Sequence, residues 1–125
     1  MSDTDSGLEG FRNWTLRVLA RLAASSEIQL EYIVNLDVGS DELLLEFDDV
    51  LGAARGRESD GSLKLSEYRL LVKVDEAANS VAAMGGDIWS HESVRSSILW
   101  GDLRLTAGVV HSELASSWGT SGVAL

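Results

Sequence analysis

The chain has 125 residues, 45% of them hydrophobic and 24% charged, and its formal net charge at pH 7 is −10. This length suits one globular domain, and the excess of 20 acidic over 10 basic residues disfavours binding to nucleic acid or to an anionic membrane surface, because both attract Lys and Arg. The absence of Cys excludes disulfide bonds and thiolate metal sites.

We therefore expect a single acidic domain over residues 1–125, with flexible ends at about 1–5 and 117–125 because these segments are rich in small and polar residues. The first ten residues, MSDTDSGLEG, lack the basic and apolar regions of a signal peptide. No apolar run approaches the roughly 18 residues of a membrane span. These features predict a cytoplasmic location.

The first predicted helix covers residues 7–24. Ser6 and Glu9 form the S-x-x-E pattern of a capping box, which places the start of the helix at Ser6. Side chains suited to a buried helix face then recur every three or four residues: Leu8, Phe11, Thr15, Val18 and Leu22. The serine pair at 25–26 ends this helix and caps the next one.

The segment 27–36 fits two patterns. A strand is indicated by alternating residues: Ile28, Leu30, Tyr32 and Val34. A helix is indicated because Leu30, Ile33 and Val34 share one helical stripe. No other run combines alternation, β-branched residues and hairpin turn residues, so a strand here would have no pairing partner. A helix is the preferred interpretation.

A third helix is predicted from Asp41 to Ala54, with Ser40 as its cap after a break at Gly39. On a helical wheel its apolar residues gather on the side that should face the core: Leu43, Phe47, Val50, Leu51 and Ala54. Residues 54–62, ARGRESDGS, are predicted to form a loop because of their Gly and Ser content.

A fourth helix is predicted at residues 63–84, ended by the glycines at 85–86. Ser90 should cap a short helix at 91–97, and a last long helix begins near Ile98. The core positions predicted for that helix are Trp100, Leu103, Ala107, Val110 and Leu114. Trp118 is a candidate to dock the C-terminal tail onto the domain.

These elements predict an all-α helical bundle of four long helices plus one or two short ones. The chain contains no Pro, which agrees with long uninterrupted helices. The alternative is an α+β fold with strands near residues 28–34 and 68–74.

Sequence motifs for catalysis or cofactor binding are missing. The nucleophile motif G-x-S-x-G does not occur, and no spacing ties His91 or His111 to a serine. The pattern starting at Asp37 has Glu42 where an EF-hand calcium loop requires glycine. Neither a P-loop nor a G-x-G-x-x-G motif is present. We therefore expect no catalytic residue, no metal site and no cofactor.

Acidic residues cluster in residues 22–54, which contain eight of them and no Lys or Arg. Like charges at helical spacing cost roughly a few tenths of a kcal/mol per pair, so we expect this surface to serve a basic partner, with Leu45 as a hydrophobic anchor inside a charged rim. The predicted partner-binding residues are Glu31, Asp37, Asp41, Glu42, Leu45, Glu46, Asp48 and Asp49. A helix face that is merely solvated is the alternative.

The block LDVGSDELLLEFDDVL at 36–51 contains the pattern D-V-G-x-D-E-x-x-x-E-F-D-D. In this block, and in segments further along the chain, the sequence resembles small acidic helical bacterial proteins of immunity type. Residues 84–86 and 88–90 match their helix end and the tryptophan segment after it, and residues 100–104 match the start of their final helix. This chain departs from the pattern at 98–99, where Ile-Leu stands in the place of a proline that commonly starts the last helix.

The resemblance implies an antidote that binds and neutralises a cognate toxin without performing chemistry itself. An inhibitor of a nuclease can offer carboxylates to a basic, phosphate-binding site and gain association rate from electrostatic steering. The predicted function is an immunity or inhibitor protein that binds a basic toxin domain. The alternatives are a regulatory or adaptor helical protein and, less favoured, a metal-binding or enzymatic helical bundle.

Overall fold

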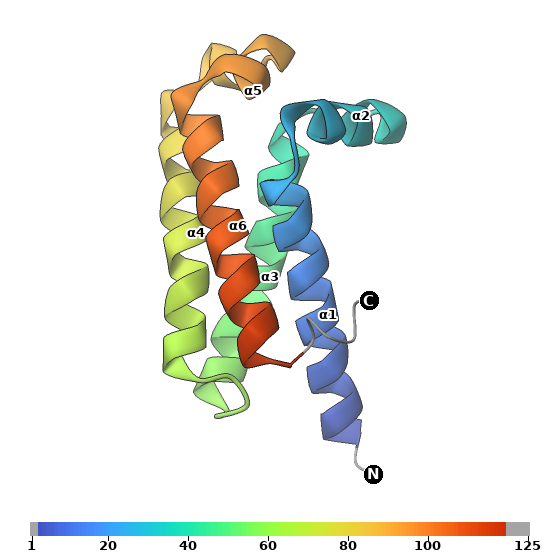
Figure 1. The fold of residues 1–125 in the computed structure, drawn as a ribbon, viewed down its shortest axis with the longest axis vertical. Helices are drawn as coiled ribbons and strands as arrows, with labels where there is room; N and C mark the ends of the chain where they lie inside the picture. The colour runs from blue at the N-terminus through green and yellow to red at the C-terminus, as the bar shows by residue number, and fades with distance from the viewer. Residues whose placement is uncertain (1–2, 120–125) are drawn as a thin grey trace.

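The computed structural model of the protein describes residues 3–119. Within this range the chain forms six α-helices and one short 3₁₀ helix: α1 (Asp3–Ala23), α2 (Ser26–Leu36), α3 (Asp41–Ser59), α4 (Leu65–Met84), η1 (Gly86–Trp89), α5 (His91–Ser96) and α6 (Ile98–Ser117). The four long helices α1, α3, α4 and α6 run alternately up and down as a bundle, with α2 and α5 across the same end (Figure 1). The predicted all-α fold is confirmed. The α+β alternative is wrong, because residues 28–34 and 68–74 are helical.

Each long helix packs against two others and buries one apolar face between them. Helix α6 contacts α1 and α4, and α3 contacts the same two helices. The core positions predicted for α3 and α6 are all buried. The largest fully buried side chain is Trp100, whose indole nitrogen donates a 2.8 Å hydrogen bond to the Ile88 carbonyl oxygen and so ties α6 to η1. No helix within residues 3–119 is both long enough and apolar enough to cross a membrane.

Helix α1 starts earlier than the capping pattern predicts. Residues 3–5, expected to belong to a flexible end, already form its first turn, so Ser6 lies inside the helix and not at its start. Aspartate is a favourable residue type in a first helical turn because its charge complements the helix dipole. Residues 1–2 of the expected flexible end lie outside the described range.

The loop predicted at residues 54–62 is wrong in most of its length, because α3 continues to Ser59. Ala54 is fully buried, and the guanidinium of Arg57 lies 5.1 Å from the centre of the Phe11 ring, so contacts with α1 favour the helical course. The true connection to α4 is short and turns at Gly61, whose φ of 84° suits glycine. Local Gly and Ser content could not reveal these contacts.

Ser40 does not cap α3 as predicted. It has φ −65° and ψ −21°, which are helical values, whereas a capping residue adopts an extended conformation. Its hydroxyl donates instead to the carbonyl oxygen of Trp89 in η1, and the residue is 2% exposed. The start of α3 is therefore held by a tertiary contact. The predicted caps Ser25 and Ser90 do accept hydrogen bonds from the first turns of α2 and α5.

The end of α6 is docked onto the start of α4, as predicted for Trp118. The indole nitrogen of Trp118 donates a 2.7 Å hydrogen bond to Glu67, and Trp118 is 9% exposed. Glu67 is itself 5% exposed and also accepts a hydrogen bond from the backbone nitrogen of Lys64. Of the flexible end expected at residues 117–125, Ser117 is helical and residues 120–125 lie outside the described range.

Candidate protein-binding surface

One buried glutamine on α2 links this helix to α1 and α6. Gln29 is fully buried, and its amide nitrogen donates to the carbonyl oxygens of Arg21 and Leu22 at 3.2 and 2.9 Å. Its amide oxygen accepts a 3.1 Å hydrogen bond from Arg104 of α6, and Arg104 also donates to the carbonyl oxygen of Val94 in α5. These bonds hold α2 across the end of the bundle.

The buried face of α2 differs from the predicted stripe at one position. Leu30 and Ile33 are buried as predicted, but Val34 is 59% exposed and Gln29 is buried in addition. The spacing of hydrophobic residues does not predict that a glutamine is buried. Burying its amide group is favourable only when other parts of the structure form hydrogen bonds with it. Val34 instead adds apolar area to the outer surface, as do Leu36 and Val38, which follow it in the sequence and are also exposed.

Glu46 is engaged inside the protein by residues of α1 and α2. Its carboxylate forms a 2.7 Å salt bridge with Arg21 and accepts a hydrogen bond from the Tyr32 hydroxyl. The Arg21 guanidinium also lies 4.1 Å from the centre of the Tyr32 ring. The hydrogen bond to Glu46, together with burial, raises the pKa of Tyr32. Glu46 therefore joins three helices, and its charge is balanced by Arg21.

The outward face of α3 brings five of the predicted residues together. Asp41, Leu45 and Asp48 follow at spacings of four and three, so they share one stripe on the exterior of the helix, and all three are exposed. Asp49 is exposed and Glu42 half-buried, both on the side of this stripe nearer Glu46. Leu45 is 49% exposed. We call Asp41, Glu42, Leu45, Asp48 and Asp49 the α3 acidic surface.

A carboxylate of α4 extends this surface beyond the predicted residues. The pKa of Asp48 is raised, first by partial burial, and then by the negative charges of Asp75 and Asp49. Asp75 belongs to α4 and was not among the predicted site residues. In the sequence Asp75 directly follows Val74, which is buried in the core. Asp75 comes near Asp48 only because α3 and α4 pack against each other.

The two remaining predicted residues lie on α2 and directly after it. Glu31 is exposed on α2. Asp37 is exposed at the C-terminal end of this helix and adopts a left-handed conformation with φ 55°, which Asp tolerates better than most non-glycine residues. Its backbone nitrogen closes the helix by donating to the carbonyl oxygen of Val34. Both carboxylates precede the α3 acidic surface in the sequence.

Asp48 offers a test of electrostatic strain in this surface. The variant Asp48→Asn is expected to raise the free energy of unfolding at pH 7, because it removes the cost of desolvating this carboxylate and its repulsion from Asp75 and Asp49. The gain should be less than about 0.5 kcal/mol, because exposed charges are screened. The gain should shrink as the pH falls through the raised pKa of Asp48, where the native carboxyl becomes neutral. Urea unfolding at pH 7 and at pH 4 measures both effects.

Asp60 supplies the matched control for that experiment. Hydrogen bonds from the side chain and backbone of Ser62 lower the pKa of Asp60, so its charged form is favoured in the folded state. Asp60→Asn should therefore lower stability at pH 7. A loss of stability in Asp48→Asn of the same sign would contradict the inferred repulsion at the α3 acidic surface.

Electrostatic attraction and apolar contact are the interactions that the α3 acidic surface can offer to a partner. Among residues 3–119, no group of three or more His, Asp or Glu side chains is arranged to hold a metal ion. His91 is exposed at the start of α5, and His111 is half-buried on α6. The clustered carboxylates can attract cationic groups, and Leu45 can be buried by a partner that excludes water.

The fold and the surface define a class of protein: an up-down-up-down four-helix bundle with two short helices across one end and an acidic outer face on α3. Comparison of the chain with protein-family models, with curated proteins and with solved structures finds no match. The resemblance to immunity-type proteins therefore rests on the sequence motifs alone, and its functional implication is a proposal.

Proposed function

We propose that this protein is a non-enzymatic inhibitor of immunity type, which binds and neutralises a basic toxin domain through the α3 acidic surface. The observation that carries the proposal is the position of Leu45. This side chain is 49% exposed on the same stripe as two exposed aspartates, Asp41 and Asp48. A leucine inside a ring of carboxylates suits a partner that presents an apolar pocket surrounded by Lys and Arg.

The exposed carboxylates and Leu45 contribute to binding in different ways in this proposal. Exposed carboxylates gain little from single ion pairs, but together they attract a basic partner over a distance and raise the association rate. Leu45 supplies the energy that keeps the complex together, because burying an apolar side chain releases water from it. The exposed Val34, Leu36 and Val38 extend the apolar area at the end of α2.

Glu46 acts indirectly in this proposal. Because its carboxylate is paired with Arg21 and Tyr32, a partner would have to break these contacts in order to use it. Its task is to hold α2, which carries Glu31 and ends at Asp37, next to α3. The proposed site of action is the bacterial cytoplasm, where the antidote would protect the cell from the toxin.

A growth assay tests the proposal directly. Basic reading frames that neighbour this gene are expressed in a bacterial host, alone and together with the intact protein. We expect one such product to arrest growth and co-expression to restore it, and the purified pair should form a complex that weakens as salt is raised. If no neighbouring product is toxic, or if co-expression leaves toxicity unchanged, the inhibitor function is wrong.

Charge reversal tests the proposed surface in the same assay. The double variant Asp41→Lys with Asp49→Lys should weaken complex formation about tenfold or more and slow association, because it reverses two charges of the α3 acidic surface. The control is Glu9→Lys with Glu92→Lys, which changes the net charge equally at exposed positions on α1 and α5. Equal weakening by both double variants would show that only net charge matters and would sink the site assignment.

A further inference from the structure

A row of exposed apolar side chains on α6 is not used by the proposed function. Ile98 is 79% exposed, Leu105 72% and Val109 59%. Their spacings of seven and four place them on one face of the helix. Scattered exposed apolar residues are ordinary, whereas three on one stripe, with the exposed Asp102 between Ile98 and Leu105, form a patch of the kind that marks an interaction surface.

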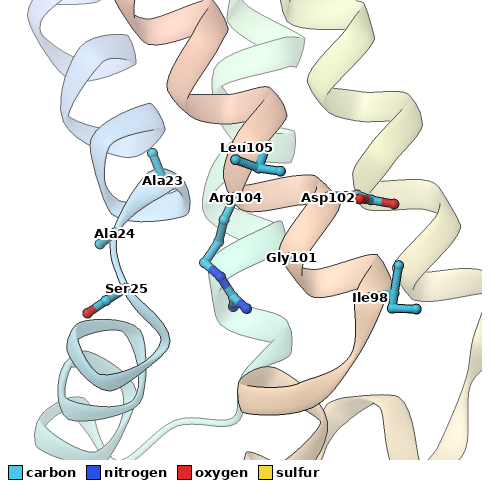
Figure 2. A pocket seen from close by; sticks show the side chains of 8 residues that line it. All are labelled: Ala23, Ala24, Ser25, Ile98, Gly101, Asp102, Arg104 and Leu105. Carbon is cyan, nitrogen blue, oxygen red and sulfur yellow. The ribbon is translucent and has the colours of Figure 1, made fainter.

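The patch borders an open hollow between the end of α1 and the start of α6. The hollow has a volume of about 540 Å³ and is lined by Ala23, Ala24, Ser25, Ile98, Gly101, Asp102, Arg104 and Leu105. Its lining includes small residues on both sides: Ala23 and Ala24 at the end of α1, and Gly101 on α6 (Figure 2). A protruding apolar ridge and a hollow with small side chains therefore lie beside each other on the same face.

Charge is distributed unevenly between this face and the rest of the bundle. Residues 3–23 and 98–117, which make up α1 and α6, contain four Arg and five acidic residues. Residues 24–97 contain 15 acidic and six basic residues. The α1–α6 side is thus nearly neutral, while the helices between them carry almost the whole negative charge of the protein.

We propose that a second copy of this chain covers the α1–α6 face, which makes the protein a two-fold symmetric homodimer. A two-fold interface uses the same patch on both copies, so it requires a surface that is complementary to itself. Here the ridge at Ile98 and Leu105 of one copy can enter the hollow of the other, and the reverse contact forms at the same time. Association through this face also meets the least charge repulsion between two chains of net charge −10.

The arrangement leaves both α3 acidic surfaces free. In the bundle α3 contacts α1 and α4, and α6 contacts α1 and α4, so α3 and α6 occupy opposite corners. A basic partner, by contrast, would favour the acidic side. The dimer inference is independent of whether the α3 acidic surface binds a toxin.

Sedimentation equilibrium of the full chain tests this proposal. The expected mass is twice the 13.5 kDa of the single chain, and Leu105→Glu should raise the dimer dissociation constant at least about tenfold, because it places a charge in a desolvated contact. The control Met84→Glu, at a 64% exposed position near the end of α4, should leave it unchanged. Circular dichroism checks that Leu105→Glu is folded, and Val109→Glu repeats the test if it is not. A monomer up to roughly 1 mM chain, or a dimer unaffected by both variants, would overturn the proposal.

Two further measurements separate this interface from the acidic one. The native chain has no Cys, so Leu105→Cys should form a disulfide-linked dimer under mild oxidation, whereas Met84→Cys should not. Raising the salt concentration should strengthen the dimer, because it screens repulsion between two acidic chains, but should weaken binding of a basic partner. A dimer that dissociates with salt, or equal cross-linking at both positions, would contradict the α1–α6 interface and leave the proposed inhibitor function untouched.

Discussion

Replacing Leu45 with alanine is expected to weaken binding of the basic partner by about 2 kcal/mol, which is roughly 30-fold in the dissociation constant. Half of this side chain is already exposed in the free protein, so the fold loses little when it is shortened, less than about 1 kcal/mol. The complex loses more, because the partner must exclude water from the whole side chain. Isothermal titration calorimetry with the purified toxin domain measures the change in affinity, and urea unfolding measures the change in stability.

Leu65 is the matched control for this experiment. It is 48% exposed at the start of α4, almost the same as Leu45 at 49%, but it does not belong to the α3 acidic surface. Leu65→Ala should change stability by a similar amount and leave partner binding intact. If both leucines affect binding equally, or if Leu45→Ala leaves binding unaltered, the hydrophobic anchor is assigned to the wrong place.

Replacing Glu46 with alanine is expected to lower the free energy of unfolding by about 2 kcal/mol. The variant leaves the Arg21 guanidinium without its counter-charge and the Tyr32 hydroxyl without its acceptor, while both groups remain partly buried. An uncompensated, partly buried charge costs more than an exposed one. Urea unfolding of the purified protein measures the loss.

A double-mutant cycle with Arg21→Ala identifies the cause of that loss. If the salt bridge is responsible, the double variant should be destabilised by less than the sum of the two single variants. Asp41→Ala is the comparison on the same helix, and its effect should stay within about 0.5 kcal/mol because Asp41 is exposed. A Glu46→Ala variant as stable as Asp41→Ala would contradict the network between α1, α2 and α3.

Leu45 and Glu46 show what a sequence pattern can and cannot predict in this protein. A helical wheel predicts which residues of α3 leave the core, because the 3.6-residue period is local, and it correctly places Leu45 outside and Phe47 inside. The same wheel treats Glu46 as one more exposed carboxylate. It cannot show that Arg21, 25 positions earlier, lies within 2.7 Å of it.

Long-range contacts also decided the features that the patterns missed. Gln29 is buried because α1 and α6 supply partners for its amide, and Asp75 joins the acidic surface because α4 packs beside α3. Continuation of α3 beyond residue 54 likewise depends on contacts with α1, since Arg57 lies over the Phe11 ring. In each case the deciding partner is distant in the chain, so no local spacing reports it.

The sequence by itself determined the all-α fold class, the buried faces of α3 and α6, and the concentration of negative charge in residues 22–54. These properties follow from composition and helical period, which act over a few residues. Only the tertiary structure decided which carboxylates remain free and which are used internally, and that the near-neutral face of α1 and α6 lies apart from the acidic one. The physical reason is that burial and charge pairing depend on which helices become neighbours, and the packing of the whole bundle sets that arrangement.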